Sequence, residues 1–316
     1  MVGIIYRTFD EPRDYERGIR LARVGDLVVS KSGVFEASLT TMTFGRVWLQ
    51  SGSDSLARSL RIEIEDSRRT MLFLTDWHSV PIIQSGTNFG ARDVVSFGQN
   101  TSHFQRSFGP TDWTAISLPP GDLEAAVHGF LGSDIGDPSG SLWGKPAVEH
   151  LTRLRGLRYD LSRLISSGEK TLQNPEVVRS LEQTLTAAMV ACLTDRIESS
   201  RAPGGLRHQQ IMRRFGDWLN ANSNRAVYIK EVCTALGVSA ATLRRCCEEH
   251  LRMSPMQYLW LRRMNLVRRE LQQKNLRTTV TATAMNFGFW HLGRFADEYR
   301  SLFGESPSST LARRPA

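Results

Sequence analysis

Two segments near the C-terminal end of the sequence place arginines and small residues directly after a glycine turn. In the first, Leu236-Gly-Val-Ser239 is followed by Ala240, Ala241, Thr242, Arg244 and Arg245. Glycine can adopt the left-handed turn conformation and serine can cap the next helix, so this order predicts two helices joined by a tight turn. Small side chains allow close approach to a groove, and a guanidinium offers two parallel hydrogen bonds to guanine. The segment therefore predicts contact with DNA bases.

A second copy of this pattern follows along the chain. Gly288 lies 51 residues after Gly237, and Ser306-Pro307 lies 52 residues after Ser254-Pro255. The candidate DNA-contacting residues of the second copy are Trp290, His291, Gly293 and Arg294. Two copies at matched offsets are a stronger signal than one, because a single turn pattern is short. For the bulky Trp290, an apolar contact to a base and a packing or backbone-contacting role are equally consistent with the sequence.

A long helix over residues 256–271 is predicted between the two copies, with Ser254 as its N-cap. Its apolar side contains Tyr258, Leu259, Leu261, Leu266 and Leu271. The other side is basic, and there Arg262 and Arg268 are predicted to contact DNA phosphates. A rigid helix fixes the separation of the two recognition helices. That separation must be about 34 Å if they enter successive major grooves on one face of the duplex.

The excess positive charge lies in the same part of the chain. Residues 206–316 contain 18 Lys and Arg against 8 Asp and Glu, whereas the preceding 205 residues contain 22 against 24. A polyanionic partner for this C-terminal third is expected, because each neutralised phosphate releases counterions. Charge alone does not separate DNA from an anionic membrane, but the repeated turn pattern favours double-stranded DNA.

The N-terminal part has a β-like pattern. Short segments between about 34 and 120, separated by Gly, Ser, Asn and Asp, predict strands of a sandwich or small barrel, whereas residues 1 to about 30 show little periodicity. Leucine stripes between 144 and 199 predict a helical hairpin that packs on the barrel or pairs with a second subunit, and we favour a homodimer. The predicted fold class is α+β: a β-barrel or cupin-like sensor domain with a helical hairpin, then an all-α domain with two helix-turn-helix units. The expected divisions are 1–140 (β-rich), 141–199 (hairpin), 200–206 (linker) and 207–316 (DNA-binding).

Sequence motifs for enzyme chemistry are missing. There is no glycine-rich phosphate loop, paired-histidine metal signature or Gly-x-Ser-x-Gly segment, and the four cysteines lack zinc-ligand spacing. A DNA-repair methyltransferase needs a reactive cysteine in a zinc or Pro-Cys-His setting, and the first cysteine here is Cys192. We therefore expect no catalytic residue, metal or cofactor, and hence not an enzyme.

The remaining expectations concern a ligand and the location of the protein. Trp48, Trp77 and Trp113 are the candidates for lining an apolar ligand cavity, although aromatic residues more often simply build the core. No apolar stretch approaches 18 residues and the N-terminus lacks a secretory pattern, so a cytoplasmic location is expected.

Residues from about 207 to 312 resemble the DNA-binding domain of the AraC/XylS family of bacterial transcription regulators. The matching segments are Leu-Gly-Val-Ser at 236–239, Ser-Pro-Met-Gln-Tyr-Leu at 254–259, Arg-Arg-Met-Asn-Leu-Val-Arg-Arg-Glu-Leu at 262–271, Asn-Phe-Gly-Phe at 286–289 and Leu-Phe-Gly-Glu-Ser-Pro at 302–307. Residues 288–295 are particularly similar to the ethanolamine-operon regulators of that family. Asp297 departs from the pattern, because many members have a DNA-contacting arginine there, so the contribution of the second unit to sequence readout is open.

The resemblance implies a promoter-binding regulator, usually an activator that contacts RNA polymerase. It also implies that an N-terminal β-barrel, when present, senses a small-molecule effector. The alternative is a constitutive or protein-partner-controlled regulator whose N-terminal domain only dimerises.

Overall fold

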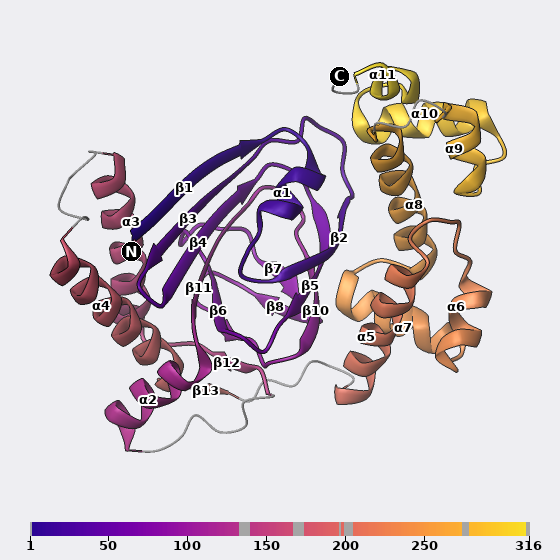
Figure 1. Cartoon of the computed structure of the whole chain (residues 1–316). Coiled ribbons are helices and arrows are strands. Elements are labelled where there is room, and N and C mark those ends of the chain that lie inside the picture. Colours follow the sequence, from indigo (N-terminus) through magenta and orange to yellow (C-terminus); the bar gives the residue numbers. More distant parts are fainter. Residues whose placement is uncertain are drawn as a thin grey trace.

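Two antiparallel β-sheets form the N-terminal part of the computed structural model, which describes residues 2–132, 140–166, 174–195, 197–198, 205–273 and 278–313 (Figure 1). The larger sheet has the order β1 (Val2–Phe9), β3 (Ala37–Phe44), β4 (Val47–Asp54), β11 (Thr111–Leu118), β6 (Arg69–Leu74), β9 (Val94–Ser96), β12 (Leu142–Gly144) and β13 (Ile197–Glu198). The smaller sheet has the order β2 (Arg23–Val29), β5 (Arg58–Ile64), β10 (Thr101–Arg106), β7 (Ile82–Gln84) and β8 (Thr87–Phe89).

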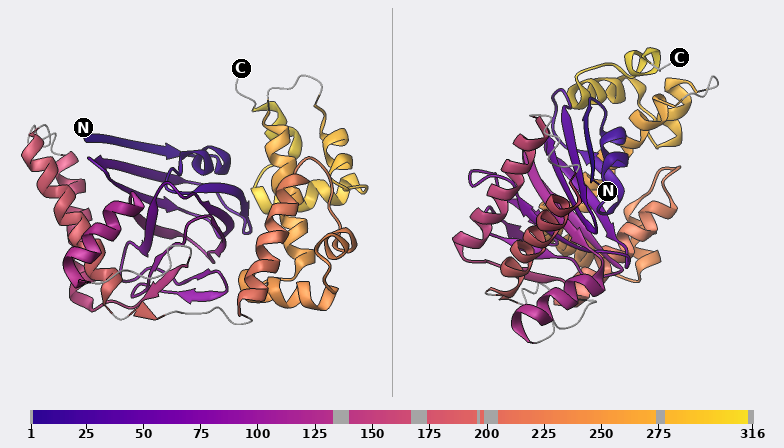
Figure 2. Two further views of the ribbon diagram at one scale, coloured as in Figure 1. Left: turned by 60° about the horizontal axis from the view of Figure 1, so that its bottom comes forward. Right: turned by 60° about the vertical axis from the view of Figure 1, so that its left-hand side comes forward.

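The faces of the sheets follow from the alternation of side chains along each strand. In β6, Leu72 and Leu74 belong to a core between the two sheets, whereas Met71 and Phe73 belong to a core on the outer face of the larger sheet. That outer face is covered by α2 (Pro120–Leu131), α3 (Val148–Ser166) and α4 (Pro175–Thr194), as Figure 2 shows. The apolar stripes of α3 and α4 are thus packed on the sheet, which is one of the two alternatives that the sequence left open.

The first 30 residues, for which the sequence pattern predicts no element, form β1, α1 (Pro12–Gly18) and β2. β2 lacks a clean alternation because both of its faces are covered. Leu27 and Val29 point into the core between the sheets, and Asp26 and Val28 point toward the C-terminal helices. A strand buried on both faces loses the polar half of the pattern by which strands are usually predicted.

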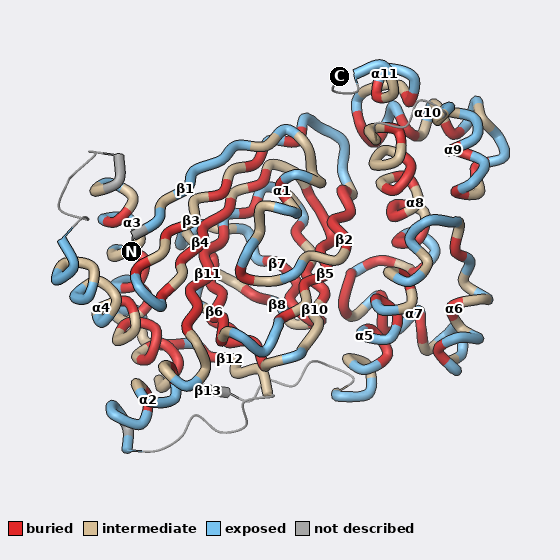
Figure 3. The backbone as a smooth tube through the Cα atoms, viewed as in Figure 1, coloured by how far each residue is buried: buried red, intermediate tan, exposed pale blue. Residues whose placement is uncertain are grey.

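The C-terminal part is all helical, and the predicted α+β class is confirmed. Its helices are α5 (Gly205–Ala221), α6 (Ile229–Leu236), α7 (Ala240–Leu251), α8 (Pro255–Leu271), α9 (Val280–Asn286), α10 (Leu292–Phe303) and α11 (Pro307–Ala312). Of the predicted linker 200–206, residues 200–204 lie outside the described residues. The helices share one core, which Val28 and Phe104 of the smaller sheet join, so buried residues continue from the sheet into α5, α7 and α8 (Figure 3).

Candidate nucleic-acid interface

The first helix-turn-helix unit consists of α6 and α7, and its turn has the conformation that the sequence predicts. Gly237 is left-handed with φ of 64°, and its N–H bonds back to the carbonyls that end α6. The Ser239 Oγ accepts a hydrogen bond from the Thr242 N–H at 3.1 Å, so the serine caps α7. A capped first turn holds the N-terminal half of α7 in a defined position.

The exposed side of α7 contains the residues predicted to contact bases. Its buried side packs Leu243, Cys246, Cys247 and Leu251 into the helical core. The exposed side presents Ala240, Ala241, Arg244 and Arg245, with Thr242 half-buried. The Arg244 Nε donates to the Glu248 carboxylate one turn later at 2.7 Å, which orients the guanidinium along the helix.

The second unit, α9 and α10, also turns at a left-handed glycine. Gly288 has φ of 78°, a conformation in which other residues are strained, and a Cβ atom there would lie 2.7 Å from the Tyr228 hydroxyl and displace it. Trp290 is 67% exposed, which excludes the interpretation of this residue as a core-packing side chain. His291, Gly293 and Arg294, which follow it, are also exposed.

Arg294 is held differently from Arg244. Its Nε donates to Glu298 at 2.8 Å, and the other oxygen of Glu298 accepts a hydrogen bond from the Trp260 indole of α8 at 3.3 Å. This chain of contacts ties the second recognition helix to α8. Asp297 lies on the same helix, three residues after Arg294.

The connecting helix α8 shows where the sequence reasoning was wrong. Arg262 is 2% exposed, its Nε donates to Asp26 of β2 at 2.7 Å, and its Nη2 donates to the carbonyl of Leu219. Arg268 pairs with Glu11 at 3.0 Å and with Glu305 at 3.3 Å. In this arrangement both guanidiniums stabilise the interface between the domains and neither is available to a DNA phosphate.

Other residues of this interface had no role in the prediction. The Asn265 amide of α8 bonds both the N–H and the carbonyl of Val29, each at 3.0 Å, so it completes the backbone pairing of β2. Phe104 of β10 stacks on Phe215 of α5, with ring centroids 6.3 Å apart. The sequence did contain one signal of this interface. Asp26 is the single carboxylate in the apolar run Asp26-Leu-Val-Val29, and a buried charge requires a partner of opposite charge.

The three tryptophans proposed as a ligand pocket do not share a cavity. Trp113 lines a cavity of about 40 Å³ between the sheets and donates from Nε1 to the Tyr15 hydroxyl at 2.8 Å. Trp48 and Trp77 instead stack against arginines, with Arg68 4.1 Å and Arg155 3.9 Å from the ring centroids. Their rings are occupied by cation–π contacts and are not part of the cavity lining.

The residues that the structure describes contain no group of three or more His, Cys, Asp or Glu side chains suited to hold a metal ion. A search of the same residues finds no helix with the length and apolar character needed to cross a membrane.

Comparison with known proteins identifies a helix-turn-helix domain in the C-terminal part. A family model described as "Helix-turn-helix domain" matches residues 232–313. The XylDLEGF operon transcriptional activator 3 of Pseudomonas putida is 27% identical over 184 residues, which are 56% of this chain and 55% of that protein. The XylDLEGF operon transcriptional activator 2 of the same species is 36% identical over 111 residues, which are 34% of this chain and 70% of that protein.

A solved structure is also similar to about a third of the chain. A probable AraC family transcriptional regulator from Rhodopseudomonas palustris CGA009 is 34% identical, with 34% of this chain and 99% of that chain covered and a TM-score of 0.30. The chain spans about half the length of the first two curated relatives that it matches, at 55% and 54%.

Proposed function

Because the chain belongs to the AraC/XylS family of helix-turn-helix transcriptional regulators, we propose that it binds promoter DNA through α7 and α10 and activates transcription. The observation that supports this proposal is the presence of two exposed recognition surfaces, on α7 and α10, that the single long helix α8 connects. α7 offers Ala240, Ala241, Thr242, Arg244 and Arg245, and α10 with the turn before it offers Trp290, His291, Gly293 and Arg294. The names of the Pseudomonas relatives describe transcriptional activators, which supports activation. A contact with RNA polymerase is part of this proposal, because an activator acts on the polymerase at the promoter.

The proposed DNA contact is tested by footprinting of the purified protein on promoter fragments. Two protected segments about one helical turn apart on one face of the duplex are expected, because α8 fixes the separation of α7 and α10. A single protected segment would limit sequence readout to one unit. Transcription in vitro with added RNA polymerase then tests activation, and a fall in transcript would make the protein a repressor.

We propose further that the N-terminal part makes DNA binding responsive to a small molecule. The support is the direct contact between β2 and α8, which links this part to the helix between the two recognition helices. From the similarity of residues 288–295, we also propose that the protein belongs with the ethanolamine-operon regulators of the family. Formation of a homodimer is a further prediction.

The alternative is a constitutive regulator, and a metabolite panel separates the two. A compound that binds only the folded state must raise the thermal unfolding midpoint. A midpoint and a DNA affinity that no compound changes would favour the constitutive regulator.

A further inference from the structure

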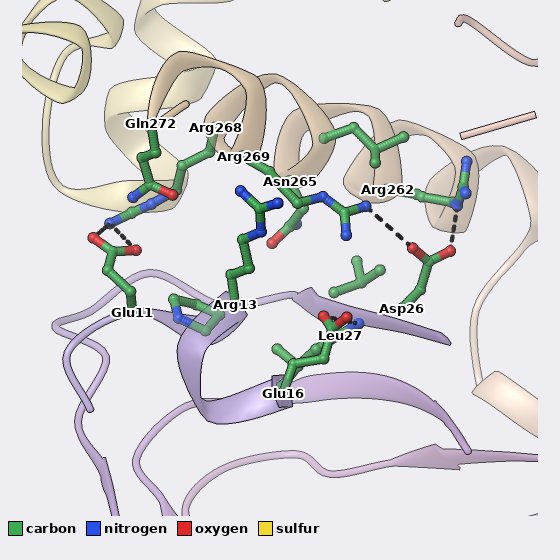
Figure 4. A pocket seen from close by; sticks show the side chains of 13 residues that line it. Glu11, Arg13, Glu16, Asp26, Leu27, Arg262, Asn265, Arg268, Arg269 and Gln272 are labelled. Carbon is green, nitrogen blue, oxygen red and sulfur yellow. Dashed lines mark hydrogen bonds and ion pairs between the residues drawn. The ribbon is translucent and has the colours of Figure 1, made fainter. Parts of the chain in front are cut away.

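A cleft lies between the two domains, and it is much larger than the cavity inside the sheets. The cleft has a volume of about 630 Å³, against about 40 Å³ for the cavity beside Trp113. Metabolite-sized ligands occupy sites of about 300–1,000 Å³. The cleft is lined by α1 and β2 on one side and by the end of α5 and α8 on the other. A smaller cavity, drawn in Figure 4, shares Arg13, Asp26 and Arg269 with the cleft as lining residues.

Most charged side chains around the cleft already have partners. Arg262 bonds Asp26, Arg268 bonds Glu11 and Glu305, and Arg23 bonds Glu63. The lining of the cleft contains three arginines, Arg13, Arg23 and Arg269, against two carboxylates, Asp26 and Glu270, so it carries a net positive charge.

Two guanidiniums, one from each domain, are compensated more weakly than these arginines. Arg13 of α1 forms no hydrogen bond or ion pair with any residue in the described ranges. Arg269 of α8 reaches Asp26 only at 3.5 Å, and it shares that carboxylate with Arg262. Figure 4 shows both guanidiniums in the space between the domains.

The electrostatics of the cleft favour an added anion. Burial, then the positive charges of Arg17 and Arg269, lower the pKa of Arg13, and the smaller effects of Asp14 and Glu16 oppose this shift. Burial also raises the pKa of Glu16 to about 7, and this carboxyl therefore carries only part of its charge at neutral pH. An oxyanion accepts two parallel hydrogen bonds from a guanidinium, and this geometry suits a pair of arginines that face one cavity.

We propose that the interdomain cleft binds a small organic oxyanion, a metabolite with a carboxylate or phosphate group, which bridges Arg13 and Arg269. Asn220, Ser223 and Asn224 at the other end of the cleft can bond hydroxyl groups of the same ligand. This inference rests on the effector response proposed above and names its site and its class of ligand. Binding there would tie α1 to α8 and so stabilise the contact that holds the connecting helix.

The test measures binding of citrate and of inorganic phosphate to the full chain by thermal shift and calorimetry, against sodium chloride at equal ionic strength. At least one of the two anions is expected to raise the unfolding midpoint saturably. Arg13→Gln and Arg269→Gln are each expected to weaken its affinity at least about 10-fold, the usual consequence of losing one charge-assisted pair. Arg7→Gln, which removes the same charge from the exposed surface of β1, should behave as the wild type.

A variant of the DNA-binding face separates the two places where an anion could bind. Retained affinity in Arg13→Gln and Arg269→Gln, with loss in Arg244→Gln, would place the anion on α7 and overturn the proposal. No saturable shift with either anion, or an equal shift in every variant, would also overturn it. Promoter affinity without added anion should be the same in Arg13→Gln and in the wild type, so failure of this site is distinguishable from failure of the proposed DNA binding.

Discussion

The first helix-turn-helix unit (α6 and α7) rests against the smaller sheet, whereas the second (α9 and α10) lies at the far end of α8 (Figure 1). In the first unit, Ser239 caps the recognition helix and Arg244 pairs with Glu248 of the same helix. In the second, His291 forms no side-chain cap and Arg294 is tied through Glu298 to α8. Two copies of one motif are thus stabilised in different ways. The first depends on its own cap and on the N-terminal domain, and the second depends on the connecting helix.

The largest effect is expected from breaking the contact between β2 and α8. Asp26→Ala leaves the Arg262 guanidinium buried without its carboxylate, which should cost about 3–5 kcal/mol of unfolding free energy. Urea unfolding measures the loss, and hydrogen exchange should locate it first in α5 and α8, because the Arg262 Nη2 also bonds the Leu219 carbonyl. The double variant Asp26→Ala, Arg262→Met should recover most of the stability. A loss below about 1 kcal/mol in the single variant would mean that water reaches the guanidinium.

The Asp26–Arg262 pair also shows what sequence reasoning could not supply. The glycines, caps and exposed arginines of both units are local features, separated by a few residues, so the sequence predicts them well. Arg262 and Asp26 are 236 positions apart. A row of arginines on a helix has the same pattern whether it faces phosphates or the carboxylates of another domain, so the prediction chose the wrong partner.

The tryptophans show the same limit of local patterns. Trp113 and Trp48 both pack against the core between the sheets, where Trp113 lines the cavity and Trp48 is stacked with Arg68. Trp77 lies in the turn after β6 and is stacked with Arg155 of α3. The three residues are alike in the sequence, and only contacts with distant segments distinguish them.

Acid should weaken the first unit more than the second. His250 at the end of α7 is 2% exposed, and burial, then the positive charges of His208 and Arg252, lower its pKa to about 4. The groups around it are His208 of α5, Glu249 of α7, Arg252 directly after α7, and His103 of β10. Because the unfolded chain binds this proton near pH 6.5, the stability from the neutral ring is complete above that pH. It is lost as pH falls toward 4, by about 2–3 kcal/mol at pH 4.5.

His250→Leu provides the measurement of that effect. Urea unfolding at pH 7 and at pH 4.5 should show a smaller acid loss in this variant than in the wild type. His291→Leu, at an exposed position of the second unit, should leave the acid loss unchanged. Equal acid losses in the wild type and in His250→Leu would contradict the assignment to this imidazole.

The two recognition helices should differ in sequence discrimination. Arg244→Ala should reduce the preference for the cognate fragment over a single-base variant by about 1–3 kcal/mol, because a bidentate contact to a base is lost. Arg294→Ala should cost less, because Glu298, which pairs with this guanidinium, is itself fixed by the Trp260 indole, and because Asp297 adds negative charge on the same helix. Binding titrations with both fragments measure the ratio, and Arg7→Ala is the control. A loss from Arg244→Ala that is uniform over all sequences would assign this arginine to a phosphate.

The smallest effect concerns the caps and tests whether the two recognition helices are held as differently as their first turns indicate. Ser239→Ala removes the acceptor of the Thr242 N–H and should cost about 1 kcal/mol of unfolding free energy. His291→Ala should cost less than about 0.5 kcal/mol, because no cap bond is lost there. Urea unfolding at pH 7 measures both losses. If the loss is equal in the two variants, the cap does not distinguish the first unit from the second. The position of α7 must then be fixed by its packing against β10.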